Sequence, residues 1–114
     1  MRVDDSTMRT IEWALSAETE RQRVSANNLA NLNTPGFRSS RVAFESSLAD
    51  ALRPGGSGVA ARSTGSANTP VNLNGNDVVL EEETMILNKS GLHYEALSQA
   101  LTMKFSALRA SIGR

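Results

Sequence analysis

Apolar residues recur with helical spacing in two long parts of the chain, one toward each end. The first part runs from about Asp5 to Asn31, where no glycine or proline interrupts the sequence. Its apolar residues fall on one stripe at steps of three and four: Met8, Ile11, Leu15, Leu29 and Leu32. The same stripe is polar in its middle, at Glu18, Gln22 and Ser25. The pattern predicts a helix about 40 Å long, with Asp4, Asp5 and Ser6 supplying its N-cap.

The second part, from about Asp77 to Ile112, carries a heptad pattern. One column is large throughout: Leu80, Leu87, Tyr94, Leu101 and Leu108. The interleaved column begins small and ends large: Thr84, Gly91, Ser98, Phe105 and Ile112. Alternating steps of four and three predict a helix with a continuous a/d seam. Since glycine inside a helix costs about 1 kcal/mol against alanine, we expect a packing reason for Gly91.

The region between these parts is rich in Gly, Ser, Asn and Pro from about Arg53 to Asn76. This composition predicts a loop, with one short hairpin near residues 71–76 around the Asn74-Gly75 turn pair. Upstream of it, Phe44, Leu48 and Leu52 share one helical face, which favours a short helix. We therefore expect an all-α fold of one helical domain. Residues 1–52 and 77–114 form a coiled-coil-like hairpin, and residues 53–76 link them.

Charge and composition narrow the function. Twelve basic and twelve acidic residues cancel in a chain of 114 residues, so no net field attracts nucleic acid. There is no cysteine, and aromatic residues make up only 4%. No apolar run is long enough to span a membrane, and the first ten residues lack the apolar segment of a cleavable signal peptide. A small helix pair with extra apolar positions is marginal alone, so we expect it to pack against other chains.

Little in the chain indicates catalysis or a bound cofactor. The single histidine, His93, has no second His or Cys to complete a metal site and is expected at a surface or an interface. The Glu81-Glu82-Glu83 run is interpreted as charge on a solvated helix face that favours the helix dipole. Arg21 and Arg23 pair with Glu18 and Glu20 on a helix surface, and Trp13 is a core or interface anchor. We expect no enzyme activity, no cofactor and no metal.

One string of residues is distinctive. Residues 26–38, ANNLANLNTPGFR, resemble the N-terminal motif of the rod and hook axial proteins of the bacterial flagellum. The motif reads approximately Asn-Asn-x-Ala-Asn-x-Asn-Thr-x-Gly-Tyr/Phe-Lys/Arg. The C-terminal part, from Gly75 onward, is similar to the small proximal rod subunits of the FlgB type. The matching positions are Gly75, Asn76, Val78, Leu80, Glu83, Met85, Tyr94, Leu97, Gln99, Ala100, Leu101, Lys104, Phe105 and Leu108.

This resemblance implies a structural subunit of the flagellar basal-body rod, which self-assembles and transmits torque across the periplasm. Its implied partners are further copies of itself, other rod subunits, the adaptor that joins the rod to the membrane ring and, transiently, the type III export gate. Neither nucleic acid binding nor direct membrane insertion is implied. Phe44 and Leu48 fit the family's gate-recognition pattern, although they are also ordinary i,i+4 neighbours on a helix. Export would proceed without a cleaved signal peptide. The alternatives are a FlgC-type proximal rod subunit and a generic secreted helical-hairpin adaptor.

The asparagines of the motif raise a separate question, because asparagine is a mediocre helix former. We expect the assembly interface to include Asn27, Asn28, Asn31 and Asn33, whose amides would fix register between subunits as a buried Asn does in coiled coils. The seam would contribute Leu80, Leu87, Tyr94, Leu101, Phe105 and Leu108. The alternative is that the asparagines only cap and fray the end of the helix, which Thr34-Pro35-Gly36 then terminates.

Overall fold

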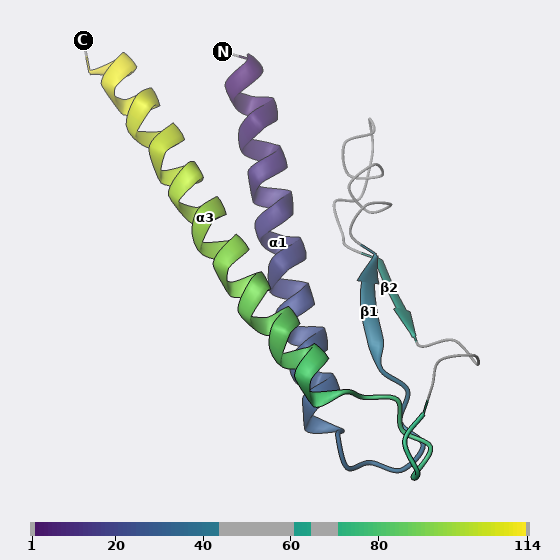
Figure 1. Ribbon diagram of the computed structural model, residues 1–114. Coiled ribbons are helices and arrows are strands. Elements are labelled where there is room, and N and C mark those ends of the chain that lie inside the picture. The colour runs from purple at the N-terminus through teal and green to yellow at the C-terminus, as the bar shows by residue number, and fades with distance from the viewer. Residues whose placement is uncertain (1, 44–60, 65–70, 114) are drawn as a thin grey trace.

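The computed structural model describes residues 2–43, 61–64 and 71–113. Two long helices, α1 (Arg2–Ala30) and α3 (Leu80–Ile112), form an antiparallel pair. A two-stranded arm of β1 (Ser40–Ala43) and β2 (Ala61–Thr64) stands beside them (Figure 1). The molecule is elongated, with a longest dimension of 65 Å. The predicted hairpin of long terminal helices is thus confirmed.

The helices begin and end where their sequences change. Because α1 already begins at Arg2, Asp4 and Asp5 lie inside its first turns and do not cap it, so the predicted N-cap is wrong. At its other end α1 stops before Thr34-Pro35-Gly36, where Gly36 adopts a positive φ of 74°. Helix α3 has the expected acidic first turn, and its last turn is closed by the Gly113 N–H, which donates to the Arg109 carbonyl at 2.9 Å.

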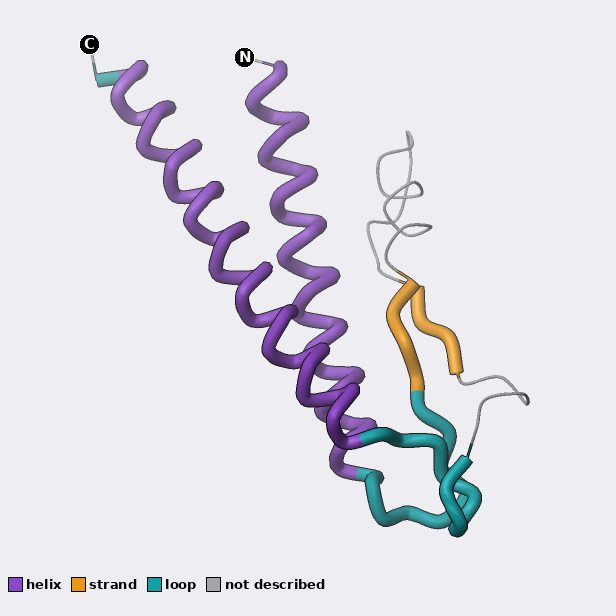
Figure 2. Tube along the Cα trace, in the orientation of Figure 1, coloured by secondary structure: helices purple, strands orange, loops and turns teal. Residues whose placement is uncertain are grey.

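The two helices are closest near the connecting loops and separate toward the chain termini, as Figure 2 shows. Few apolar side chains are buried between these elements: Ile11, Trp13, Ala17, Val24 and Val78. Trp13 is therefore a core residue. Polar buried residues outnumber the apolar ones: Glu18, Ser25, Asn28, Ser39, Ser40, Asn76, Asp77, Glu83 and Ser90. Such residues are rarely buried unless they are paired, so hydrogen bonds must organise much of this interior.

The predicted a/d seam of α3 is covered only in part within the chain, where Leu87, Leu101 and Leu108 are half-buried. Leu80, Tyr94 and Phe105 remain 41–49% exposed, and Ile112 is 81% exposed. The face toward α1 is centred one position earlier in each heptad, on the column Glu83, Ser90, Leu97 and Lys104. Glu83 is fully buried, which corrects its interpretation as a solvated charge. Hydrophobic periodicity could not reveal this face, because its two most buried members are polar.

The arm was not predicted. Its strands are antiparallel, with Ser40 opposite Thr64 and Ala43 opposite Ala61. The short helix favoured at Phe44, Leu48 and Leu52 lies outside the described residues, and the residues just before it, Ser40–Ala43, are extended in β1. The predicted hairpin at residues 71–76 is a turn without strands. Neither described helix has an apolar stretch that could cross a bilayer.

Gly91 has no packing role among the described residues, because a Cβ atom built there meets nothing within 4 Å. We expect Gly91→Ala to raise the free energy of unfolding by about 1 kcal/mol, the helix-propensity difference between the two residues. Urea unfolding followed by circular dichroism measures this. The control is Gly113→Ala, whose Cβ would lie 3.2 Å from the Arg109 carbonyl oxygen and should bring no gain. A less stable Gly91→Ala protein would contradict the prediction.

Candidate functional site

The Asn-rich motif and the segment before α3 meet in one structure, which we call the asparagine clasp: residues 31–39 and 72–78. Asn76, in the segment before α3, binds the turn that follows α1. Its Nδ2 donates to the carbonyl oxygens of Asn31, Leu32 and Thr34 at 2.7, 3.2 and 2.8 Å. Asn76 is fully buried, and so it holds the turn that follows α1 in place away from water.

Two glycine turns bring the halves of the clasp together. The Gly36 N–H donates to the Asn74 carbonyl at 2.9 Å, and both Gly36 and Gly75 have positive φ. A Cβ atom on Gly75 would lie 3.6 Å from the Gly36 Cα. Glycine is favoured at both positions because other L-residues are strained in this conformation.

Asp77 fixes the other side of the clasp. Its Oδ1 accepts from the Ser39 N–H at 2.6 Å, and its own N–H donates to the Phe37 carbonyl at 3.3 Å. Arg38 forms an ion pair with its Oδ2 at 3.7 Å. The conspicuous residues at the two ends of the sequence, Gly36-Phe37-Arg38 and Gly75-Asn76-Asp77, are therefore bound to one another.

A second cluster joins α1, α3 and the first residues of β1; we call it the arm joint. Asn28 donates from Nδ2 to the Ser40 carbonyl at 2.9 Å, and its Oδ1 accepts from the Ser40 N–H at 3.0 Å. The same Nδ2 lies 3.1 Å from Glu83 Oε1. Arg41 Nη2 pairs with Glu83 Oε2 at 2.7 Å and with Glu82 Oε1 at 2.8 Å. Asn28 and Glu83 are both fully buried.

The charge state of Arg41 follows from its neighbours. Burial lowers its pKa, but the hydrogen bonds to Glu82 and Glu83 and their negative charges outweigh that effect and raise the pKa above the ordinary arginine value. The guanidinium therefore stays charged at every physiological pH.

A third cluster lies midway along the helix pair. The Ser90 hydroxyl donates to Glu18, with its single hydrogen shared between the carbonyl oxygen at 3.0 Å and Oε1 at 2.7 Å. Glu18 Oε2 also lies 3.5 Å from Arg21 Nη1 and 3.3 Å from His93 Nδ1. The predicted Arg21–Glu18 and Arg23–Glu20 pairs are confirmed, although Glu18 is buried and not on the surface. His93 is half exposed, as expected.

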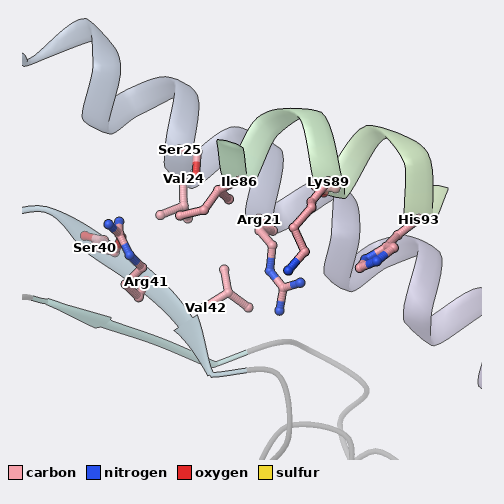
Figure 3. Close-up of a pocket in the computed structure, with 10 residues that line it drawn as sticks. Arg21, Val24, Ser25, Ser40, Arg41, Val42, Ile86, Lys89 and His93 are labelled. Atoms are coloured by element: carbon pink, nitrogen blue, oxygen red, sulfur yellow. The ribbon is translucent and has the colours of Figure 1, made fainter. Parts of the chain in front are cut away.

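A cavity of about 270 Å³ opens between these clusters, lined by α1, β1 and α3 (Figure 3). Val24, Val42 and Ile86 form its apolar wall, and the side chains of Arg21 and Lys89 reach into it. Across the described ranges, no three histidine or acidic side chains converge as a metal site would require.

The structure separates the predicted asparagines into two groups. The Asn28 side chain is buried and bonds to Ser40 and Glu83 of the same chain. Asn31 caps α1, because its Nδ2 donates to the Asn27 carbonyl at 2.9 Å and its Oδ1 accepts from Thr34 Oγ1 at 3.1 Å. The capping alternative thus describes Asn31. The side chains of Asn27 and Asn33 are exposed.

The sequence interpretation missed the roles of Asn76, Glu83 and Ser90. A signal for two of them existed, since Glu83 and Ser90 are one heptad apart and precede the small column by one position. For Asn76 the only sequence signal was its position directly after the Asn74-Gly75 turn pair.

Comparison with known proteins agrees with this architecture. Residues 8–38 match the family model described as flagella basal body rod protein. The flagellar basal body rod protein FlgB of Bacillus subtilis is 30% identical over 122 residues, covering 96% of this chain and 95% of the relative. FlgB of Aeromonas hydrophila is 28% identical, covering 85% of each chain.

The helix pair, its exposed seam and these matches define a flagellar basal body rod protein, a structural class and not an enzyme. Both relatives are FlgB proteins. They favour this type over the FlgC-type subunit and the secreted adaptor, the two alternatives that the sequence left open. The chain belongs to the FlgB family of proximal rod subunits.

Proposed function

We propose that the chain builds the proximal rod through the outer faces of α1 and α3, in contact with further copies of itself, other rod subunits and the adaptor to the membrane ring. The observation that carries this proposal is the apolar surface of α3. Its exposed large side chains are Leu80, Met85, Leu92, Tyr94, Met103, Phe105 and Ile112. Exposed apolar area of this extent on one helix is typical of an interface. Leu80, Tyr94, Phe105 and Ile112 belong to the seam, which half-buried Leu87, Leu101 and Leu108 continue, whereas Met85, Leu92 and Met103 lie outside it.

The mechanical role follows from such packing. A shaft that transmits torque across the periplasm must resist twisting, and interlocked helices twist only by breaking close-packed contacts. In this proposal residues 1–52 and 77–114 act as one helical unit, and residues 53–76 connect them.

Export is proposed through the type III gate without a cleaved signal peptide. Phe44 and Leu48 are the proposed recognition pair, on the strength of the family pattern alone.

Asn27 and Asn33 are proposed as register contacts between subunits, because their side chains are exposed beside the clasp. We expect the double variant Asn27→Ala/Asn33→Ala to keep the helicity and stability of the purified chain, since neither side chain is buried. In cells that carry it as their only copy, electron microscopy of basal bodies should show fewer complete rods. The control is Asn72→Ala, an exposed clasp asparagine on the other segment that donates to the Val78 carbonyl at 3.2 Å. Normal rods and normal swimming in the double variant would remove these residues from the interface.

A further inference from the structure

We propose that the arm joint is a positioning device: it fixes the direction in which the β1–β2 arm leaves the helix pair, and rod assembly requires that direction. The inference rests on the proposed assembly function, but its first step concerns the single chain and can be tested without any rod.

The first argument is the way Asn28 holds the arm. Ser40 is the first residue of β1, and the Asn28 amide binds both its backbone N–H and its carbonyl, at 3.0 and 2.9 Å. Two such bonds from one planar amide reproduce the pairing that a neighbouring strand would offer. Hydrogen bonds are directional, so this pairing sets an angle between α1 and β1 and not only a distance.

The second argument is the link to α3. Glu83 receives the Asn28 Nδ2 on one carboxylate oxygen, while Arg41 pairs with the other and with Glu82. Arg41 is the second residue of the arm, so consecutive arm residues are tied to different helices. Asn28 and Glu83 are the buried members of this network, and it tolerates few alternative geometries because breaking their pairs leaves a desolvated amide or carboxylate.

The third argument is that packing does not replace the joint. In the described part of the arm beyond Arg41, Val42 lines the 270 Å³ cavity opposite Val24 and Ile86 on the helices. A cavity forfeits the contacts that would otherwise define a unique packing. The direction of the arm therefore depends on the polar joint at its base.

The experiment measures the distance between helix and arm in solution. The chain contains no cysteine, so Ala26→Cys on α1 and Ala43→Cys at the end of β1 give a specific pair of spin labels for pulsed electron resonance. We expect one narrow distance distribution in the parent protein and a broad or multiple one in Asn28→Ala and in Arg41→Gln. The matched control is Arg23→Gln, which removes an ion pair with Glu20 within α1 that is not part of the arm joint and should keep the narrow distribution.

Arg41→Gln keeps the test decisive if Asn28→Ala does not fold, because Arg41 lies outside both helices and circular dichroism should report unchanged helicity. The second readout is rod formation in cells that carry each variant without labels. Broad distributions with lost rods and unchanged helicity support the proposal. A narrow distribution in folded Arg41→Gln would show that the arm joint does not fix the direction of the arm. A broad distribution with normal rods would show that rod assembly does not require a fixed direction. If the parent chain does not enter rods at all, the assembly function fails while the distance result still stands.

Discussion

Replacing Asn76 by alanine should destabilise the chain more than any other single asparagine replacement in the clasp. The change leaves the carbonyls of Asn31, Leu32 and Thr34 without their buried donor, and the Val78 N–H without the Oδ1 acceptor that lies 2.6 Å away. Each buried group left unpaired costs about 1–3 kcal/mol, and a small part of that is recovered if water enters. We expect a loss of about 3 kcal/mol in the free energy of unfolding, measured by urea titration of the helical signal.

Two variants sharpen this result. Asn33→Ala, an exposed asparagine of the same motif, should change the stability by less than about 0.5 kcal/mol. Asn76→Asp keeps the acceptor for Val78 but turns carboxylate oxygens toward the carbonyls, so it should be at least as destabilising as alanine. If Asn76→Ala and Asn33→Ala unfold at the same urea concentration, Asn76 does not stabilise the turn that follows α1.

The second large effect concerns assembly and not folding. Tyr94 and Phe105 are 41% and 49% exposed on the seam of α3, and aromatic anchors of this kind dominate interfaces. Replacing either by aspartate should weaken each subunit contact by about 2 kcal/mol, which is about thirtyfold in affinity. Because every subunit of a rod repeats the contact, we expect Phe105→Asp to abolish rods and motility. Electron microscopy of basal bodies and swimming assays measure this.

The purified Phe105→Asp protein tests whether the effect is on assembly and not on folding. Phe105 is already 49% exposed in the single chain, so its replacement should change the helicity and the urea midpoint of the variant much less than its assembly. Ser106→Asp is the matched control, since it places the same poor helix former at the adjacent exposed position, and it should form normal rods. Phe105→Leu should restore most of the assembly. Motile cells with intact rods that carry Phe105→Asp would show that the seam is not the interface.

Much of this protein was readable from its sequence. The absence of Gly and Pro before Pro35 and the heptads after Leu80 determine two long helices, because helical periodicity and helix breakers are local properties. The motif around Gly36 and the C-terminal likeness identified the family. The exposure of His93 and the burial of Trp13 were also within reach, since they follow from residue type.

Only the tertiary structure decided which faces meet and what the motif does. The a/d pattern placed Leu80 and Phe105 toward a partner but could not say that this partner is absent from the single chain. Glu83 was assigned to solvent because a charge is costly to bury alone, and its partners Asn28 and Arg41 are remote in sequence. The roles of the asparagines likewise became clear only from the structure, because their partners are also remote in sequence. Asn28 and Asn76 bind backbone groups that come from other segments, and periodicity carries no information about such pairings.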